Sequence, residues 1–434
     1  MGHRFCSPIE NSNSTDLLNA KQLGRLVPIM SDFYQHGGIA TLHHLGNPDY
    51  TKLEKELNDL SPAIALVLPC HARDLDSPVL AAILEELSQT RFIRHVIVGL
   101  DGADESQYHF ARSLFQKLPQ ETAILWNDGP RMSAIITQLN DAGMDPGARG
   151  KGRNMRLCFG YALSATDAPF VAVHDCDIVN YRREMLARLC FPVAHPEMAF
   201  EVSKGFSARF SDRLNGRVMR LLISPLLRAM EEWDGFPSTL GSLQNFRYPI
   251  SGEVCLHRRV VREIRFPSDW GVETGMMSDV FRLCAPHRVC QVDIAETYDH
   301  KHQDLSEKDP LGGLNKMACD VTLCLLRTIS AGSTIPVSID AKKLVPNYLR
   351  VAREMMRFYA ADARINLLQY DYALEDQTAT MFASAIDRAI SIFSNTPYQP
   401  PGAPGWSEIE DRLSGTASAI AEAVRLDADQ ADRV

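Results

Sequence analysis

Short apolar runs that alternate with segments of helical length are the feature that most constrains the fold of this chain. Each run ends in turn-forming or acidic residues: Ala63–Pro69, His95–Gly102, Thr122–Asp128 and Pro169–Asp177. The segments between them have helical length and period: Ser77–Gln89, Ser106–Lys117 and Asn154–Ala165. Strands that alternate with helices indicate βαβ units, and strands buried on both faces read as continuous apolar runs. The pattern predicts an α/β fold with a mainly parallel sheet.

The C-terminal half of the chain has a different pattern. We expect a strand over Met198–Val202, a helix over Leu214–Trp233, a loop and two helices over Pro249–Phe281, and a strand over Val289–Ala295. Beyond about Pro310 the predicted elements are all helices: Leu314–Ile329, Ala341–Ala361, Thr378–Phe393 and Ser407–Leu426.

These patterns suggest three parts. We predict an N-terminal extension over residues 1–60, an α/β domain over 61–305 and a helical C-terminal region over 306–434. The C-terminal helices are amphipathic, so their apolar faces need a partner surface. Either the α/β domain or a second subunit can supply it, and we expect a homodimer.

Charge and composition narrow the class of partner. Lys and Arg number 45 and Asp and Glu number 54, which gives a net charge of −9 at pH 7. Such a chain is a poor candidate for binding nucleic acid or an anionic membrane through bulk charge. Hydrophobic residues make up 45% of the sequence, as is ordinary for a globular protein with a buried core.

The sequence also carries no membrane or secretion signal that we recognise. No apolar stretch reaches the length of about eighteen residues that a membrane span needs, and the N-terminus lacks the apolar core of a signal peptide. None of the ten cysteines belongs to a C-x-x-C pair. We therefore expect a cytoplasmic protein with reduced, buried thiols.

Two carboxylates follow the fourth apolar run, at Asp175 and Asp177. Ligands of open α/β sheets bind outside the carboxyl ends of the strands, so these side chains are candidates for a binding site. Paired carboxylates suit Mg²⁺ or Mn²⁺, which bridges phosphates and neutralises a diphosphate leaving group. The alternative is an acidic loop that caps a helix near Tyr181.

A lysine between glycines precedes the helix that leads into this strand, in the run Arg149-Gly150-Lys151-Gly152. The lysine offers a positive charge, and the glycines allow close backbone approach to a phosphate. The run is not a Walker P-loop, because G-x-x-x-x-G-K-[ST] is absent. A solvated basic turn would look the same when considered alone.

Two glutamates and a late histidine complete the candidate set. Glu253 ends the run Pro249-Ile250-Ser251-Gly252-Glu253, and Glu273 lies in Trp270-Gly271-Val272-Glu273-Thr274-Gly275. A glutamate at a helix start can bind sugar hydroxyls, or it can simply interact with the helix dipole. His300 follows the expected strand over Val289–Ala295 and is a candidate metal ligand.

In this order the motifs resemble those of the retaining GT-A glycosyltransferases related to glucosyl-3-phosphoglycerate synthase and mannosyl-3-phosphoglycerate synthase. The resemblance extends from about Ala63 to Leu305. It implies a GT-A Rossmann-like domain that binds a nucleotide sugar, UDP-glucose or GDP-mannose, with Mg²⁺ or Mn²⁺. It also implies a cofactor-binding set drawn from several loops: Pro69, Cys70, His71, Asp101, Gly150, Lys151, Asp175, Ser251 and Glu273.

The resemblance further assigns roles within the site. Asp175, Asp177, Glu273 and Lys151 would be catalytic, with Asp177 and His300 as metal ligands. The acceptor would contact a second set: Gly216, Arg217, Val218 and His302. Three positions depart from the family pattern: Arg73 replaces an acid, Met219 replaces a hydroxyl residue and His302 replaces an asparagine.

The implied reaction is transfer of a hexose, most simply glucose from UDP-glucose, to 3-phosphoglycerate or glycerate in compatible-solute synthesis. The alternatives are a GT-A transferase with a lipid, glycan or protein acceptor, and a non-catalytic nucleotide-sugar-binding protein. A nucleotidyltransferase would usually carry a G-G-x-G-x-R-like loop after the first strand, and Pro69–Leu75 does not match that loop.

Overall fold

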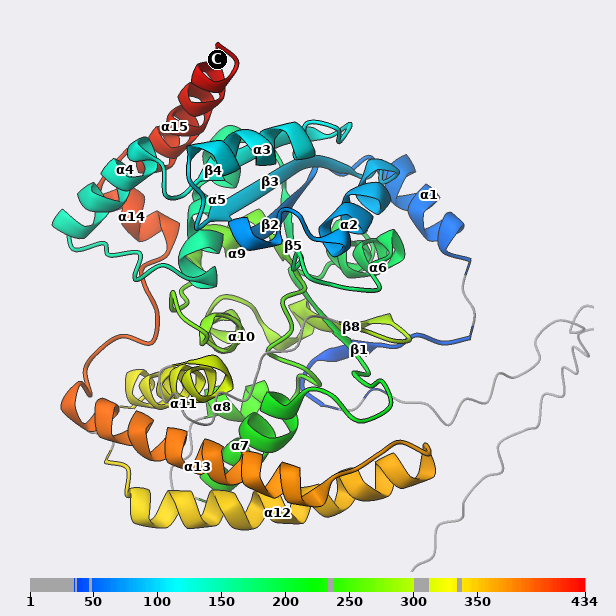
Figure 1. Cartoon of the computed structure of the whole chain (residues 1–434), viewed down its shortest axis with the longest axis vertical. Helices are drawn as coiled ribbons and strands as arrows, with labels where there is room; N and C mark the ends of the chain where they lie inside the picture. Colours follow the sequence, from blue (N-terminus) through cyan, green and yellow to red (C-terminus); the bar gives the residue numbers. More distant parts are fainter. Residues whose placement is uncertain are drawn as a thin grey trace, which may run out of the picture. The chain divides into compact units, whose positions relative to one another are not determined.

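A single sheet organises the part of the chain that the computed structural model describes, which comprises residues 35, 37–46, 49–232, 238–299, 312–333 and 338–433. Within these residues the sheet has eight strands in the order β1-β8-β6-β7-β5-β2-β3-β4 (Figure 1). The strands are β1 Ala40–Leu42, β2 Ile64–His71, β3 Ile93–Asp101, β4 Glu121–Trp126, β5 Phe170–Val173, β6 Val202–Ser207, β7 Val254–His257 and β8 Val289–Ala295.

The sheet is parallel except at one strand. β7 runs antiparallel to both of its neighbours, β5 and β6, and every other pair is parallel. Side chains of β2 alternate between two cores, with Leu66 and Leu68 in one and Ala65 and Val67 in the other. All four are fully buried, which explains why the strand reads as a continuous apolar run. The predicted α/β fold with a mainly parallel sheet is confirmed.

Helices cover the two faces of the sheet. One core holds side chains of α1 (Tyr50–Leu60), α2 (Pro78–Ser88), α3 (Glu105–Phe115) and α6 (Arg183–Ala194). The other core holds α4 (Pro130–Asp141) and α5 (Lys151–Ala165), together with the helices of the second half of the chain. A 3₁₀ turn over Ala72–Asp74 follows β2 directly.

The helices of the second half build a layer of their own. Figure 1 shows α12 and α13 side by side, with α7, α8 and α11 between them and α10. Their bounds are α7 Ser224–Glu231, α8 Ser238–Leu243, α10 Val272–Leu283, α11 Gly313–Ala331, α12 Ala341–Ile365 and α13 Tyr372–Asn395. α9 (Arg258–Glu263) packs instead against α5 and β7. Gly37–Val434 form one compact unit, so this layer shares a core with the sheet.

The chain then returns to the sheet through α14 (Trp406–Arg412) and α15 (Thr416–Ala431). α15 packs against α4 and α5. The indole Nε1 of Trp406 donates a hydrogen bond to the carbonyl of Arg156 in α5 at 2.9 Å. The last helices therefore support the helix that begins at Lys151.

Several predicted elements differ from the structure. The strand expected over Met198–Val202 is wrong, because β6 begins at Val202 and contains the polar residues Ser203 and Lys204. The helix expected over Leu214–Trp233 begins as a π-helix over Val218–Ile223 and continues as α7. The helix expected over Ser407–Leu426 is interrupted near Gly415, whose φ of +87° lies in the left-handed region.

Candidate active site

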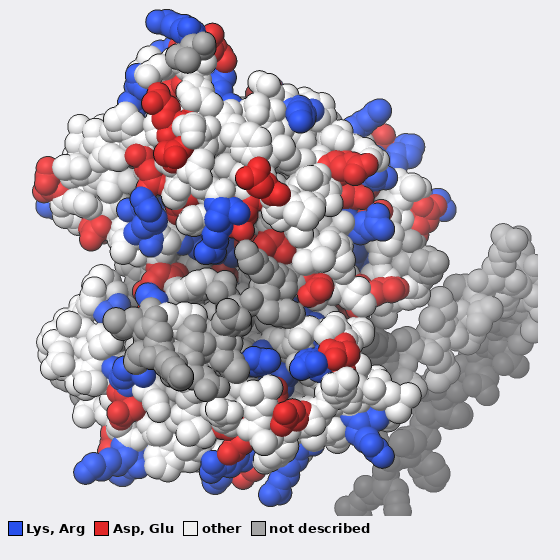
Figure 2. Space-filling model, viewed as in Figure 1, with Lys and Arg blue, Asp and Glu red and all other residues white. Residues whose placement is uncertain are grey.

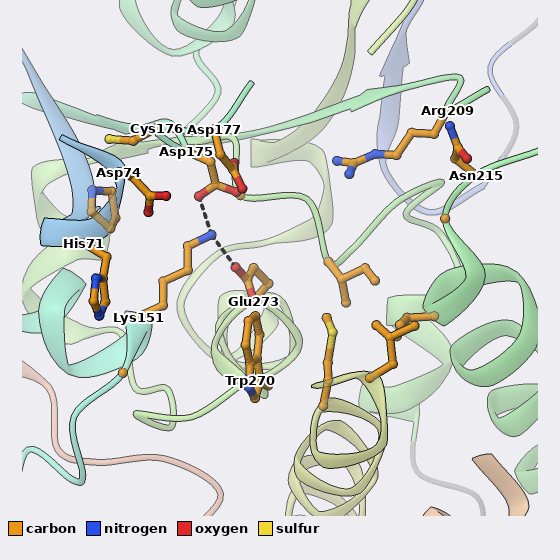
Figure 3. A pocket seen from close by; sticks show the side chains of 18 of the residues that line it. His71, Asp74, Lys151, Asp175, Cys176, Asp177, Arg209, Asn215, Trp270 and Glu273 are labelled. Atoms are coloured by element: carbon orange, nitrogen blue, oxygen red, sulfur yellow. Dashed lines mark ion pairs between the residues drawn. The ribbon is translucent and has the colours of Figure 1, made fainter. Parts of the chain in front are cut away.

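The carboxyl ends of β2, β3 and β5 meet at one side of the sheet. β2 ends at His71, β3 ends at Asp101, and Asp175 follows β5 by two residues. These residues line a cavity of about 940 Å³ (Figure 3). Loops from the second half of the chain close its other side, including the segment from Arg209 to Val218. This is where open α/β sheets bind their ligands.

A lysine held by two carboxylates lies at the centre of the cavity. The Lys151 ammonium forms an ion pair with Asp175, and a second one with Glu273 Oε1 at 2.8 Å. Figure 3 shows the three side chains converging from different elements: Lys151 opens α5, Asp175 follows β5 and Glu273 lies in the first turn of α10. The D-x-D, Gly-Lys-Gly and G-V-E motifs are thus brought together in space.

The electrostatics of this cluster fix the charge of the lysine. Burial alone would lower the pKa of Lys151, but Asp175 and Glu273 outweigh it and raise that pKa above its ordinary value. Burial, followed by the charge of Asp175, raises the pKa of Asp177 to about 7. Lys151 therefore stays positively charged, and Asp177 lies where the field of neighbouring acids is strongly negative.

Two glycines allow the close approaches in this cluster. A Cβ on Gly252 would lie 2.1 Å from Oδ2 of Asp175, so a side chain there would displace the carboxylate. A Cβ on Gly152 would lie 2.1 Å from the carbonyl oxygen of Pro267, which is backbone and cannot rotate away. The glycines beside Lys151 thus permit packing of α5 against the Pro267–Ser268 turn.

The β3 side of the cavity carries a second polar group. Asn127 donates a hydrogen bond from Nδ2 to Oδ1 of Asp101 at 2.8 Å, and Arg149 pairs with Asp128. Burial raises the pKa of Asp101, while the hydrogen bond from Asn127 opposes that change. Gly102, with φ of +72°, turns the chain beneath the His71 ring. Fixed donors and acceptors of this kind suit a nucleobase and ribose.

The carboxylates suit a divalent metal ion. Asp175 and Asp177 offer hard oxygen donors, and the pKa of Asp177 is raised first by burial and then by the charge of Asp175, a repulsion that a cation would relieve. Within the described ranges no group of three or more His, Cys, Asp and Glu side chains is arranged to hold a metal. His300, the expected further ligand, lies outside the described residues. The donor set that is described fits Mg²⁺ or Mn²⁺.

Sequence reasoning missed a buried group of charged and aromatic residues behind the carboxylates. Arg209 lies between the rings of Tyr248 and Tyr298, with its guanidinium carbon 4.1 Å and 4.2 Å from their centroids. Tyr298 donates a hydrogen bond to Oε1 of Glu253 at 2.6 Å. Buried Lys204 donates to the carbonyl of Ser251. No local motif marks these residues, because Lys204 lies in a strand with the polar residues Ser203 and Ser207.

The outer surface differs from the cavity. Figure 2 shows Lys and Arg interspersed with Asp and Glu over the face in view, without one dominant basic patch. The described part of the chain includes no helix with the length and apolar character to cross a membrane. On this face, therefore, no single sign of charge marks a binding surface.

Comparison with known proteins identifies the family. No family model matches the chain. The glucosyl-3-phosphoglycerate synthase of Persephonella marina is 36% identical over 400 residues, which cover 92% of this chain and 99% of that protein. This chain belongs to the glucosyl-3-phosphoglycerate synthase family of glycosyltransferases. The family member of Methanococcoides burtonii is 31% identical over 84% of this chain and 91% of its own length.

Solved structures agree with this fold. A glucosyl-3-phosphoglycerate synthase from Mycobacterium tuberculosis, in complex with Mn²⁺, UDP-glucose and phosphoglyceric acid, is 21% identical with a TM-score of 0.50. It aligns with 69% of this chain and 90% of its own. The mannosyl-3-phosphoglycerate synthase of Rubrobacter xylanophilus is 20% identical with a TM-score of 0.52, over 69% of this chain and 84% of its own. The GT-A fold expected from the motifs is confirmed.

The glucosyl-3-phosphoglycerate synthase motifs therefore lead to one cavity in this chain. The expected site residues that line it are Pro69, Cys70, His71, Asp101, Gly150, Lys151, Asp175, Asp177, Gly216, Arg217, Val218 and Glu273. Ser251 does not line it; its buried hydroxyl donates to the carbonyl of Gly205 at 2.5 Å. The expected acceptor residue His302 lies outside the described residues, as does His300.

Proposed function

We propose that this chain transfers glucose from UDP-glucose to 3-phosphoglycerate with retention of configuration at the sugar C1. The observation that carries the proposal is the Lys151–Asp175–Glu273 cluster, with Asp177 beside it, at the carboxyl end of β5. Names of the relatives support the same donor and acceptor classes.

The donor would lie along the strand ends. Asp101, held by Asn127, receives the base and ribose, near Pro69, Cys70 and His71. Lys151 donates to the diphosphate, aided by the backbone at Gly150. Glu273 accepts hydrogen bonds from the hydroxyls of the glucose, and Asp175 from the ribose or sugar. Ser251 would contact the donor sugar through its backbone and not through its side chain.

Asp177, with His300, would hold a Mg²⁺ or Mn²⁺ ion, which neutralises the diphosphate when bound. The Lys151 ammonium stabilises the negative charge that develops as the bond from C1 to the phosphate oxygen breaks. The acceptor hydroxyl oxygen forms the new bond to C1 on the same face. Its proton passes to the leaving phosphate oxygen, and the electron pair of the broken bond stays with UDP.

The acceptor would lie against Gly216, Arg217 and Val218, with His302 as a further contact. Arg217 can pair an oxyanion with two parallel hydrogen bonds. Met219 cannot supply the hydroxyl expected at its position, so glycerate is the competing acceptor. We extend the proposal to compatible-solute synthesis, because the product is a small anionic glucoside.

A crossed assay tests the proposal. The purified protein is incubated with Mg²⁺ and either UDP-glucose or GDP-mannose, each with 3-phosphoglycerate or glycerate, and products are identified by mass. We expect the products UDP and a glucosyl-3-phosphoglycerate. The coupling constant of its anomeric proton, measured by NMR, should show the same anomeric configuration as in the donor. A mannosyl product would overturn the donor assignment. Nucleotide binding without transfer to either acceptor would favour a lipid, glycan or protein acceptor, or a non-catalytic role.

We also propose that the protein acts in the cytoplasm as a homodimer. Exposed apolar side chains on the C-terminal helices support the dimer: Phe358 is 65% exposed and Ile365 is 82% exposed. The 306–434 region would then serve both packing and dimerisation, beside the 61–305 domain. Light scattering of the purified chain should give twice the monomer mass of 48.4 kDa. A mass equal to the monomer would contradict the dimer.

A further inference from the structure

Arg209–Val218, which we call the acceptor segment, closes one side of the cavity and is held by one residue of the helix that follows it. Three consecutive carbonyls of the segment accept hydrogen bonds from Arg220: that of Leu214 from Nη2 at 3.0 Å, that of Asn215 from Nε at 2.9 Å and that of Gly216 from the backbone N–H at 3.0 Å. The path of the backbone at the expected acceptor contacts therefore depends on Arg220.

The guanidinium of Arg220 is itself fixed by the C-terminal helices. Glu375 on α13 accepts two hydrogen bonds from it, at Oε2 from Nη1 at 2.5 Å and at Oε1 from Nη2 at 3.0 Å. The guanidinium carbon lies 5.1 Å from the ring centroid of Tyr359 on α12. The side chains of Arg220 and Glu375 are each 10% exposed. A bidentate pair with so little solvent holds the planar guanidinium in one orientation.

A second contact joins the acceptor segment to the turn between α12 and α13. The N–H of Gln369 in that turn donates to the carbonyl of Asp212 at 2.8 Å. The π-helix that follows the segment, Val218–Ile223, packs against both helices, and such helices are frequent at functional sites. Figure 1 shows α12 and α13 as the outer layer beneath α7, which continues this π-helix. The segment is thus connected to the helix pair at two places.

The geometry requires an arginine at this position. One side chain must donate to two carbonyls of the segment and, in another direction, to both oxygens of Glu375. A guanidinium has five donors in a planar fork, whereas a lysine ammonium donates from a single atom. A buried ion pair is weak evidence for stability, because apolar residues of similar volume often stabilise a fold equally well. Stability alone therefore does not account for this arrangement.

We propose that Arg220 and Glu375 are positioning residues that hold the acceptor segment in its binding conformation, so that α12 and α13 control the affinity for the acceptor. The proposal rests on the transferase function proposed above, whose acceptor binding it explains. Neither side chain is among the described residues that line the cavity, so both act through the backbone of the segment. When only a fraction of molecules holds the binding conformation, the apparent Kd rises by the inverse of that fraction.

A double variant tests the proposal without leaving a buried charge. Arg220→Met combined with Glu375→Met replaces the ion pair by apolar side chains, a change that often preserves stability. The full chain, loaded with Mg²⁺ and UDP, is titrated calorimetrically with 3-phosphoglycerate. If about a tenth of the molecules keep the binding conformation, the Kd of 3-phosphoglycerate rises about tenfold. The Kd of UDP, and kcat at saturating acceptor, should change less than about twofold, because saturation selects the binding conformation.

Hydrogen exchange measures the acceptor segment without any assay of activity. Backbone amides of residues 209–219 should exchange faster in the double variant, because the segment has lost the donors that fix its carbonyls. Amides of β2 and β3 should exchange as in the wild type. Urea unfolding of the same samples verifies that the double variant is folded.

Single variants separate the position of the guanidinium from its charge. Arg220→Lys keeps the charge but cannot reach both carbonyls and Glu375, so it should raise the Kd of 3-phosphoglycerate. Glu375→Gln keeps an acceptor oxygen for Arg220, so it should lower the urea midpoint and raise that Kd less than Arg220→Lys does. Arg353→Gln is the control, because it removes an exposed ion pair with Asp376 between the same two helices. It should leave every Kd unchanged.

The outcomes distinguish this proposal from the proposed function. Unchanged exchange at residues 209–219 in the double variant would overturn the positioning role, as would faster exchange with an unchanged Kd of 3-phosphoglycerate. An equal rise in the Kd of UDP would also overturn it, since the damage would then not be specific to the acceptor. A wild-type protein that binds no 3-phosphoglycerate would overturn both proposals. The predicted Kd changes in a protein that transfers no glucose would overturn the proposed function and leave the positioning role standing.

Discussion

At the scale of single residues, the cavity is defined by how closely its carboxylates approach their neighbours. Asp175 pairs with Lys151, and its carboxylate occupies the space that a Cβ on Gly252 would need. The aspartate side chain is short, so a carboxylate displaced from the space beside Gly252 cannot keep its ion pair with Lys151. The glycine of the P-I-S-G-E motif therefore acts on the ion-pair cluster directly, although it has no side chain.

Gly252→Ala should reduce transfer far more than it reduces stability. The new methyl would lie 2.1 Å from Oδ2 of Asp175, and the carboxylate can escape by rotating away from Lys151. We expect kcat to fall about 100-fold or more, with a loss of unfolding free energy of about 1–2 kcal/mol. Gly143→Ala is the control, since nothing lies within 4 Å of its added Cβ and its φ of +70° strains only a backbone outside the cavity. Equal effects of the two substitutions on kcat would contradict this account.

Asp177→Ala tests the metal assignment. Loss of a carboxylate that holds the ion should lower metal-dependent transfer by about 1,000-fold or more, because several kcal/mol of leaving-group stabilisation are lost. Initial rates with Mg²⁺ and with Mn²⁺ measure the effect, and urea unfolding checks that the variant is folded. Full activity of the variant in the presence of a chelator would show that the metal assignment is wrong.

Folding stability should depend on pH through the buried Lys204. Burial is the main cause that lowers its pKa from 10.5 to about 8. Between these values the unfolded chain holds a proton that the folded chain has released, so folding stability gains as pH rises from 8 to 10.5. The wild type should gain about 3 kcal/mol relative to Lys204→Met over this range.

Urea unfolding of both proteins at intervals from pH 7 to pH 10 measures that difference. Lys55→Met is the matched control, because Lys55 is exposed and pairs only with Asp59 among the ion pairs we observe. Its unfolding free energy should differ from that of the wild type by less than about 1 kcal/mol, as expected for an exposed ion pair. A difference for Lys204→Met that does not change with pH would mean that the buried lysine titrates normally.

At the scale of elements, strands with a continuous apolar run could be predicted from the sequence. Strands that depend on pairing with distant segments could not. The predicted strand Val289–Ala295 matches β8 at both ends, because an apolar run bounded by turns fixes a buried parallel strand. β7 and β1 escaped prediction, since each is short and forms only by pairing with strands far along the chain. β6 was displaced for a related reason: its buried Ser203 and Lys204 hide a core strand behind polar residues.

The same division applies to the site. Lys151, Asp175 and Glu273 could be expected from local motifs, because each lies where an element begins or ends. Arg209 carries no such motif, and only the fold brings Tyr248 and Tyr298 to the two sides of its guanidinium. A sequence shows isolated arginines and asparagines in loops without showing what covers them.

Arg156 shows how elements are joined around the site. It lies in α5, stacks on Phe266 at 4.5 Å and donates hydrogen bonds to the carbonyls of Phe266 and Pro404. Arg156→Met would remove these donors from the buried carbonyl of Phe266 and the partly buried carbonyl of Pro404, and should cost about 2–4 kcal/mol of unfolding free energy. Arg425→Met on the exposed face of α15 is the control, because its ion pairs are exposed. An equally small loss for both variants in urea unfolding would contradict this role.

At the scale of the whole molecule, the last helix is part of the same folding unit as the sheet. Gly37–Val434 form one compact unit, and α15 packs against α4 and α5. Arg131 in α4 forms an ion pair with the largely buried Asp427 in α15. This pair joins the last helix to a helix that covers the sheet. A perturbation of α15 should therefore reach the cavity through α5 and Lys151, rather than melt the helix alone.

Ile420→Ala tests this cooperativity. Ile420 in α15 is fully buried, so its truncation should cost about 2–5 kcal/mol, and thermal unfolding should show one transition at a lower Tm. Ile392→Ala in α13 is the matched control, since Ile392 is 42% exposed and should lose much less. Circular dichroism would follow helix content, and tryptophan fluorescence, to which all four tryptophans contribute, would follow tertiary packing, including that around Trp270 in the cavity and Trp406 in α14. Two separate transitions in Ile420→Ala would show that the C-terminal helices fold independently of the site.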